Sequence, residues 1–302
     1  MKTKTPSISY KMRRLREILK ETGGAVIAFS GGVDRTFLAA VAQEVLGARA
    51  LAVTALSPTY PQREQKEAAE LAARIGIRHE TVESNELEIP NFADNPSNRC
   101  YFCKGELFRI LRRIADRNGL PAVADGSNAD DTGDYRPGRQ AAREIGVKSP
   151  LLEASLTKDD IRRLSRKMGL PTADKPSFAC LASRFPYGNR ITPERLTAVD
   201  TVEEGLRGMG FRQVRVRHHG TIARIEVEPQ AIRRFLSPDV REKVLQLAKG
   251  AGFLYVTLDL QGYRTGSMNE ALSAEARAQH TPAAAGRRTA ATAPAGAPRR
   301  GK

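Results

Sequence analysis

Short apolar runs alternate with segments of helical apolar spacing along the first half of the chain. The apolar runs predict strands at 25–29, 50–55 and 121–124, and 79–82 is a further short predicted strand. The segments between them predict helices at 36–46, 61–75 and 104–118. Strands that alternate with helices of this length form right-handed crossover units. We therefore expect a doubly wound α/β domain whose parallel sheet is covered on both faces.

The rhythm changes after Pro176. A helix at 193–209, two β-like runs at 213–217 and 222–227, one or two further helices and a final strand at 253–258 predict a second, smaller α+β domain. We expect the larger domain to span 1–180 and the smaller one 181–270. Residues 271–302 are mostly Ala, Pro, Arg, Gly and Thr, which cannot bury enough apolar surface to offset the entropy of ordering, so this tail is expected to be disordered.

The chain is strongly basic, with a formal charge of +15 over 302 residues. The tail contributes +5 of this, from six Lys or Arg against the single acid Glu275, and the body contributes +10. Such a surface suits phosphates, nucleic acid or a polycarboxylate, but it is equally typical of a solvated basic face. No RNA-binding motif is recognisable, so we expect no specific nucleic-acid partner.

Cysteine usage and apolar content indicate the compartment. Three cysteines, an odd number, argue against a secreted disulfide framework. No window approaches the 18 or more apolar residues of a membrane span, and the N-terminus has no signal-peptide core. Residues 7–22 are basic and amphipathic, but Glu17 and Glu21 argue against a targeting segment. We expect a soluble cytoplasmic protein without a membrane partner.

A glycine pair lies where the first strand meets its helix, in Ser30-Gly31-Gly32-Val33-Asp34. Two glycines let the backbone turn and expose N–H groups, and the helix N-terminus adds partial positive charge, so a phosphate can be held by main-chain donors. An ordinary tight turn has the same local pattern. The lysine of a Walker loop is absent, which disfavours kinase or motor-type ATP hydrolysis.

This string resembles the pyrophosphate loop of the PP-loop ATPases, which cleave ATP between the α- and β-phosphates. Further motifs are similar to the LarE branch of that family, the sulfur transferases of nickel-pincer cofactor synthesis. They lie, in order, at Ser57-Pro58-Thr59-Tyr60-Pro61, Asn98-Arg99-Cys100-Tyr101-Phe102-Cys103-Lys104, Asp125-Gly126-Ser127-Asn128-Ala129-Asp130-Asp131, Asp134-Tyr135-Arg136-Pro137-Gly138, Ala179-Cys180-Leu181-Ala182-Ser183-Arg184 and 260–269. The resemblance covers roughly residues 10 to 270.

The resemblance implies an ATP site with Mg²⁺. Its residues are Ser30, Gly31, Gly32, Asp34, Arg35, Thr36, Ser57, Gly126 and Arg136. Asp125, Asp130 and Asp131 are further candidates for holding Mg²⁺, although Asp-rich loops are more often turns and caps. One position departs from the family: its loop usually ends in serine, and here Arg35 follows Asp34. Arginine offers five donors and a charge in place of one hydroxyl, so the contacts on the pyrophosphate side are expected to differ.

Cys100 and Cys103 form a C-x-x-C, and Cys180 lies near the predicted domain junction. Two thiolates one turn apart suit a metal, while a redox dithiol, a zinc site completed by histidine or unrelated buried thiols remain alternatives. Some members of the LarE-like family have only the cysteine that matches Cys180 and sacrifice its sulfur. Others have all three, which hold a 4Fe–4S cluster with one iron open for a hydrosulfide. The resemblance therefore implies the cluster type, with the three cysteines as catalytic residues and cluster ligands.

Arg215 and Arg217 alternate on one predicted strand, so their side chains share a face that suits a phosphate, or simply solvent. The resemblance implies that this pair, with Ser183, Arg184 and Glu203, binds a pyridinium mononucleotide substrate. It further implies adenylation of a substrate carboxylate and displacement of AMP by sulfur, with a sulfide donor and a homo-oligomer as expected partners. Two rival hypotheses are a PP-loop tRNA thiolase with a 4Fe–4S cluster, and a non-catalytic basic protein that binds nucleic acid. The second leaves the glycine loop and the C-x-x-C unexplained.

Overall fold

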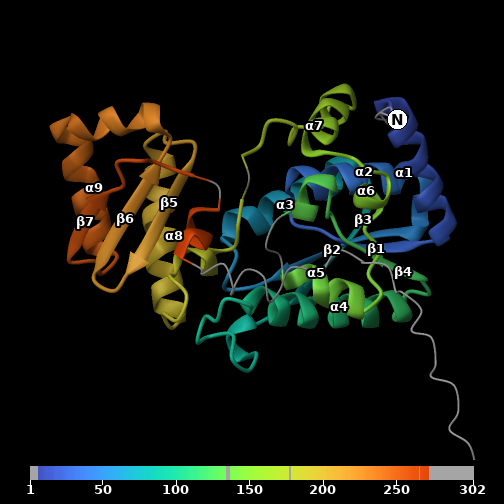
Figure 1. Ribbon diagram of the computed structural model, residues 1–302, viewed down its shortest axis with the longest axis horizontal. Coiled ribbons are helices and arrows are strands. Elements are labelled where there is room, and N and C mark those ends of the chain that lie inside the picture. The colour runs from blue at the N-terminus through green and yellow to red at the C-terminus, as the bar shows by residue number, and fades with distance from the viewer. Residues whose placement is uncertain (1–5, 134–136, 177, 265, 272–302) are drawn as a thin grey trace, which may run out of the picture.

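The computed structural model describes residues 6–133, 137–176, 178–264 and 266–271, which form two sheets with their own helices (Figure 1). Predictions for Arg136 and for the tail from 272 onward lie outside these residues. The first sheet contains β1 (Ala25–Ala28), β2 (Ala50–Leu56), β3 (Arg78–Glu83) and β4 (Ala122–Ala124). Its order is β3-β2-β1-β4 and every pairing is parallel. The predicted parallel α/β architecture is confirmed.

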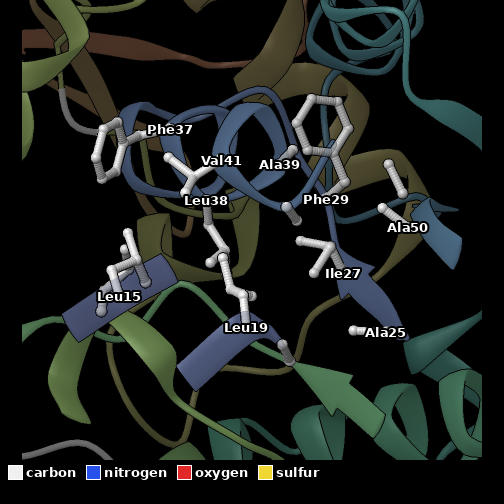
Figure 2. Close-up of a cluster of buried hydrophobic side chains, with 14 of the residues drawn as sticks. Leu15, Leu19, Ala25, Ile27, Phe29, Phe37, Leu38, Ala39, Val41 and Ala50 are labelled. Atoms are coloured by element: carbon white, nitrogen blue, oxygen red, sulfur yellow. The ribbon is translucent and has the colours of Figure 1, made fainter. Parts of the chain in front are cut away.

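Helices cover both faces of this sheet, because successive side chains of a strand point to opposite faces. From β1, Ile27 packs with α1 (Ile8–Thr22) and α2 (Val33–Leu46), as Figure 2 shows. The neighbouring Val26 packs on the other face with α4 (Arg99–Arg117). The helices α3 (Gln62–Ile75), α6 (Pro150–Glu153) and α7 (Lys158–Lys167) complete the first face, and α5 (Pro137–Glu144) the second.

The second sheet belongs to the C-terminal part of the chain. It consists of β5 (Val214–His219), β6 (Ile222–Val227) and β7 (Tyr255–Leu258), in the order β5-β6-β7. β5 and β6 are antiparallel, whereas β6 and β7 are parallel. The helices α8 (Pro193–Gly208) and α9 (Pro238–Gly250) pack against this sheet and against each other. This is the smaller α+β unit that the sequence predicts.

Several helices differ from the prediction, among them α5 and α6, which were not predicted. The helix expected at 104–118 begins earlier, at Arg99, so Cys100 and Cys103 lie within its first two turns. The helix α7 was not predicted. Thr157 opens it with a capping box, in which the Thr157 hydroxyl accepts from the Asp160 N–H and the Asp160 carboxylate accepts from the Thr157 N–H. Among the described helices, none has the length and apolar character needed to cross a membrane.

The domain boundary at residue 180 stays a prediction, because the two units share side chains. Phe92 precedes α4 in the chain, yet it is buried in the core of the smaller unit. The Asn95 side-chain amide donates to the carbonyls of Phe185 and Pro186, at 3.1 and 2.8 Å. The loop that carries these residues therefore links the units well before the predicted boundary.

The core of the smaller unit contains a fully buried ion pair. Arg184 donates to both carboxylate oxygens of Glu203, at 2.8 and 2.9 Å, and both side chains are 0% exposed. Arg207 and the backbone N–H of Val216 also donate to Glu203. Burial alone would raise the pKa of Glu203, but Arg184, followed by Arg215 and Arg207, holds it at about 2. The carboxylate is thus charged and saturated with donors.

We expect Glu203→Gln to lower the free energy of unfolding by about 3–5 kcal/mol at pH 7, because it leaves buried guanidinium groups without their anion. The pKa of Glu203 falls from 4.5 to about 2 on folding, so its contribution of about 3 kcal/mol is complete above pH 4.5 and is lost as the pH falls through 2. Urea unfolding between pH 2 and 7 measures the difference. A deficit that stays constant over this range would contradict the assignment.

Glu204→Gln provides the matched control. Glu204 is adjacent to Glu203 and also pairs with Arg207, but its side chain is 39% exposed. An exposed ion pair contributes at most about 1 kcal/mol, so this variant should change the free energy of unfolding little.

Candidate active site

The glycine loop turns sharply between β1 and α2. Gly31 has a φ of +66°, and a Cβ there would lie 3.2 Å from Leu71 Cδ1 and 3.4 Å from Ala68 Cα of α3. Gly32 is the N-cap of α2 and offers no side chain to its first N–H groups. Because these N–H groups have no acceptor within the helix, they remain directed at whatever lies beyond the loop. The loop therefore has the local geometry of a phosphate cradle.

Asp34 has a carboxylate oxygen available for a cation. Its Oδ2 pairs with Lys158 Nζ at 2.5 Å, whereas its buried Oδ1 has no hydrogen-bond partner among the described residues. The nearby Thr36 hydroxyl is fully buried and likewise lacks a described partner. Hard oxygen ligands together with phosphate are what Mg²⁺ prefers, so Asp34 fits the predicted role.

The other acidic candidates near the loop are engaged in turns. Asp125 accepts from Ser127 N, Ser127 Oγ and Ser149 Oγ. Asp130 accepts from Lys158 N, and Asp131 accepts from Asn128 N. These bonds are of the kind that shapes Asx turns. Within this group, Asp34 is the one whose carboxylate has a buried oxygen without a partner among the described residues.

A pocket opens beside the loop and reaches Cys103. Its wall includes Ser30 and Arg35 from the loop region, Cys103 and Lys104 from α4, and Tyr60. Burial, and after it the charge of Cys180, raises the pKa of Tyr60, so its hydroxyl stays protonated. One pocket therefore holds both the predicted phosphate loop and one of the predicted sulfur ligands.

Ser57 and Gly126 lie next to residues that line this pocket, Glu86 and Arg35. The Ser57 hydroxyl is within 2.9 Å of Thr59 Oγ1 and donates to the Glu86 carboxylate. Ser57 lines a second, larger cleft between the two units, which shares Tyr60 and Gln65 with the pocket. A Cβ on Gly126 would lie 2.7 Å from Arg35 Cγ, so the absent side chain makes room for Arg35.

Two lysines that the sequence analysis missed brace the loop. Lys158 pairs with Asp34, and Lys175 pairs with Glu64 at 2.8 Å and Glu67 at 2.9 Å. Lys175 Nζ also donates to the carbonyl of Gly31 at 3.3 Å. No local pattern distinguishes these lysines, because their partners lie more than 100 residues away in the chain. Lys104 did stand in a quoted motif, but without an assigned role.

The three cysteines occupy one neighbourhood. Cys100 is exposed in the first turn of α4, whereas Cys103 and Cys180 are partly buried. Burial raises the pKa of Cys103, and the charges of Glu86, Cys180 and Cys100 raise it further. Burial and then Cys100 raise the pKa of Cys180, while Arg99 and Arg184 oppose that shift. The thiols are thus close enough to influence one another, although the described residues include no group of three or more metal-ligand side chains already gathered around one point.

The predicted substrate residues form a buried cationic cluster beside Cys180. Arg184, Arg207 and Arg215 surround the Phe178 ring at 5.3, 5.9 and 5.5 Å. Burial, followed by the charge of Arg184, lowers the pKa of Arg215 to about 10. Arg217 pairs with Glu226 at 2.9 Å and donates to the Ser183 carbonyl at 2.7 Å. The structure therefore brings the predicted residues together.

Arg184 also fixes the backbone at Cys180. Its Nη1 donates to the carbonyls of Ala179 and Cys180, at 2.7 and 3.0 Å, and to Ser183 Oγ at 2.9 Å. Its other donors bind Glu203 of α8, so the guanidinium links the loop that carries Cys180 to that helix. The resemblance implies a substrate contact for Arg184, which stays a prediction. The structure shows that Arg184 positions the backbone at Cys180.

Comparison with known proteins identifies the relatives of this chain. Residues 7–97 match the family model described as NAD synthase. An uncharacterized protein of Synechocystis sp. is 48% identical over 263 residues, which cover 87% of this chain and 98% of that protein. The pyridinium-3,5-bisthiocarboxylic acid mononucleotide synthase of Lactiplantibacillus plantarum is 37% identical over 268 residues, covering 88% of this chain and 96% of the synthase. An uncharacterized protein of Methanocaldococcus jannaschii is 28% identical over 260 residues, covering 84% of this chain and 98% of its own length.

The matches to these three relatives extend over both structural units. The glycine loop and the parallel sheet of the structure fit the match to the family model. The chain belongs to the LarE family of PP-loop, ATP-dependent sulfur transferases.

Proposed function

We propose that this protein adenylates a carboxylate of pyridinium-3,5-biscarboxylic acid mononucleotide and then replaces AMP by sulfur to give the thiocarboxylate. The observation that carries the proposal is the shared pocket, in which Ser30 of the glycine loop and Cys103 of the C-x-x-C line the same wall. A relative that bears the corresponding synthase name matches almost the whole chain. Activation and sulfur delivery can therefore occur without moving the acyl group far.

In the first step a carboxylate oxygen attacks the α-phosphorus of ATP, the bond to the bridging β-phosphate oxygen breaks, and pyrophosphate leaves. Main-chain N–H groups at Gly31 and Gly32 would hold phosphate oxygens, and the open oxygen of Asp34 would hold Mg²⁺. Lys158 keeps Asp34 oriented through its ion pair. Adenylation converts a poor leaving oxygen into AMP.

In the second step sulfur attacks the acyl carbon and AMP leaves with the carboxylate oxygen. The thiols of Cys100, Cys103 and Cys180 supply the soft ligands that an iron–sulfur cluster requires, although their side chains would have to converge. A 4Fe–4S cluster bound there would supply an open iron for the sulfur to be transferred. Burial raises the pKa of Cys180, and the charges of Arg99 and Arg184 oppose that shift without reversing it.

Substrate recognition is assigned to the cationic cluster. Arg215 and Arg217 would bind the phosphate of the mononucleotide, as paired donors on one strand suit a phosphate. Ser183, in the loop that carries Cys180, would contact the substrate. Arg184 and Glu203 would act indirectly, because their ion pair is fully buried and holds the loop that carries Cys180 in place.

The same proposal covers the compartment, the sulfur source and the oligomeric state. We propose a cytoplasmic enzyme, in keeping with its three free cysteines, that receives sulfide from a donor and assembles as a homo-oligomer. Its small-molecule partners are ATP and the pyridinium mononucleotide.

Turnover with ATP, Mg²⁺ and the biscarboxylic acid mononucleotide should yield AMP and pyrophosphate. Asp34→Asn should lower the rate about 100-fold or more, because it weakens the hold on the Mg²⁺ that would neutralise the reacting phosphates. Chromatography of the nucleotides and a pyrophosphate assay measure both products. Formation of ADP and orthophosphate would exclude adenylation.

Anaerobically purified protein should be brown and contain about four irons and four sulfides per chain. Cys100→Ala, Cys103→Ala and Cys180→Ala should each lose that content, since all three thiolates are needed. Iron and acid-labile sulfide analysis, with absorbance spectra, provides the measurement.

The first two variants separate the cluster from a sacrificial mechanism. If Cys180 gave up its own sulfur, Cys100→Ala would remain active and Cys180 would lose the mass of hydrogen sulfide after one turnover. Mass spectrometry of the protein after turnover with added sulfide should instead find Cys180 intact.

A further inference from the structure

The carboxylate of Glu86 lies in the wall of the pocket beside the glycine loop and is buried, with 3% of the residue exposed. Glu86 begins the short 3-10 helix η2 (Glu86–Glu88), which comes shortly after β3. Among the described residues, no Lys, Arg or His nitrogen lies within 4.0 Å of this carboxylate. A buried carboxylate without a cation is unfavourable unless hydrogen bonds satisfy its oxygens. The hydrogen bonds of Glu86 are therefore what keeps this carboxylate in the pocket wall.

Three donors from three different segments reach this one carboxylate. The Ser57 hydroxyl, directly after β2, donates to Oε2, and the Ser84 hydroxyl, directly after β3, donates to Oε1 at 3.4 Å. The Cys103 thiol of α4 donates to Oε1 at 4.0 Å. Among the hydrogen bonds of the described residues, this is the one that a cysteine sulfur makes to another side chain. Glu86 therefore ties the ends of two strands to the helix that carries the C-x-x-C.

The Ser57 end of this network continues to the second partly buried cysteine. Ser57 Oγ accepts from the Thr59 N–H at 3.0 Å, and the Thr59 carbonyl accepts from the Leu181 N–H at 2.7 Å. Leu181 directly follows Cys180 in the chain. Ser57 and Thr59 are 5% and 1% exposed, so water has little access to these bonds. Three successive hydrogen bonds thus lead from Glu86 to the residue beside Cys180.

We propose that Glu86 is a positioning residue for sulfur transfer, which holds Cys103 and Cys180 within reach of each other. The inference rests on the proposed function, in which both thiols serve the second step. One carboxylate oxygen contacts Cys103 directly, and the other acts on Cys180 through Ser57 and Thr59. A satisfied buried network rigidifies the groups that it joins, so two thiols on distant segments keep a fixed separation.

The role of Glu86 is geometric rather than electrostatic. Burial raises the pKa of Cys103 and of Cys180, and the charge of Glu86 adds to both shifts. A negative charge beside a thiol disfavours the thiolate, so Glu86 does not assist ionisation of either cysteine. A neutral side chain that keeps the same hydrogen bonds should therefore hold the thiols equally well.

Cross-linking of the thiols tests their separation without ATP, substrate or metal. Dibromobimane becomes fluorescent when it joins two neighbouring thiols, and a Cys100→Ala background leaves Cys103 and Cys180 as the only pair. The full chain should cross-link in this background. Glu86→Leu should slow cross-linking about 10-fold or more, because it removes both acceptor oxygens and lets the thiols move apart. Glu86→Gln should stay within about threefold of the parent, since it keeps the shape and an acceptor oxygen.

Glu88→Leu is the matched control. It removes a carboxylate from the same short helix, but Glu88 is exposed and accepts from Asn85 rather than from a residue of the network. Its cross-linking rate should equal that of the parent. Monobromobimane, which reacts with one thiol at a time, corrects every rate for thiol accessibility, and thermal unfolding checks that each variant is folded. If Glu86→Leu does not fold, Ser57→Ala provides the test, because it cuts the network between Glu86 and Cys180 and should also slow cross-linking.

Four outcomes overturn the assignment: a parent that does not cross-link, a Glu86→Leu variant (or Ser57→Ala in its place) that cross-links at the parent's rate, a Glu88→Leu variant slowed as much as Glu86→Leu, and equal losses in Glu86→Gln and Glu86→Leu. The last result would make the charge of Glu86, and not its hydrogen bonds, the cause. Cross-linking needs no turnover, so each result is independent of adenylation. Failure of the proposed function would appear separately, as ADP in the turnover assay.

Discussion

The contacts of Lys175 join the three parts on which the proposed chemistry depends. One ammonium group lies between Glu64 and Glu67 of α3 and donates to the carbonyl of Gly31 in the glycine loop. It belongs to the segment that leads from the first unit to Cys180. Lys175 therefore ties the glycine loop and α3 to the segment that leads to the cysteine. With 14% of its side chain exposed, Lys175 is shielded enough for those ion pairs to be little weakened by solvent.

The fold of the first unit could be predicted because it depends on local periodicity. Runs such as 25–29 and 50–55 are apolar throughout since both faces of a parallel strand are buried, and the helices between them carry one apolar stripe. The α4 start was predicted too late, because its first six residues, which include Arg99, Cys100 and Lys104, bury only Arg99 and form no apolar stripe. The short α7 was missed for a similar reason: it is rich in Lys, Arg and Asp, and only Ile161 and Ser165 are buried.

The sequence could predict which residues belong to the candidate site, but not which of them form ion pairs with each other. Motif order indicated the loop, the three cysteines and the arginines. The structure places the loop and Cys103 on one pocket and packs the arginine cluster beside Cys180. That Arg184 would be locked to Glu203, or that Lys158 would hold Asp34, depends on contacts between segments far apart in the chain. Charged residues of this kind look like surface residues in a sequence, since nothing local distinguishes a buried ion pair from two solvated ions.

The close approach of Gly31 to α3 has a consequence for how the protein can vary. The missing side chain lets the loop lie against Ala68, with only 3.4 Å between the position a Cβ would take and the Ala68 Cα atom. A larger residue at position 68 would push the loop outward as surely as a substitution in the loop would. The freedom of the nucleotide site to evolve is thus limited by an alanine on a neighbouring helix, which has no chemistry of its own.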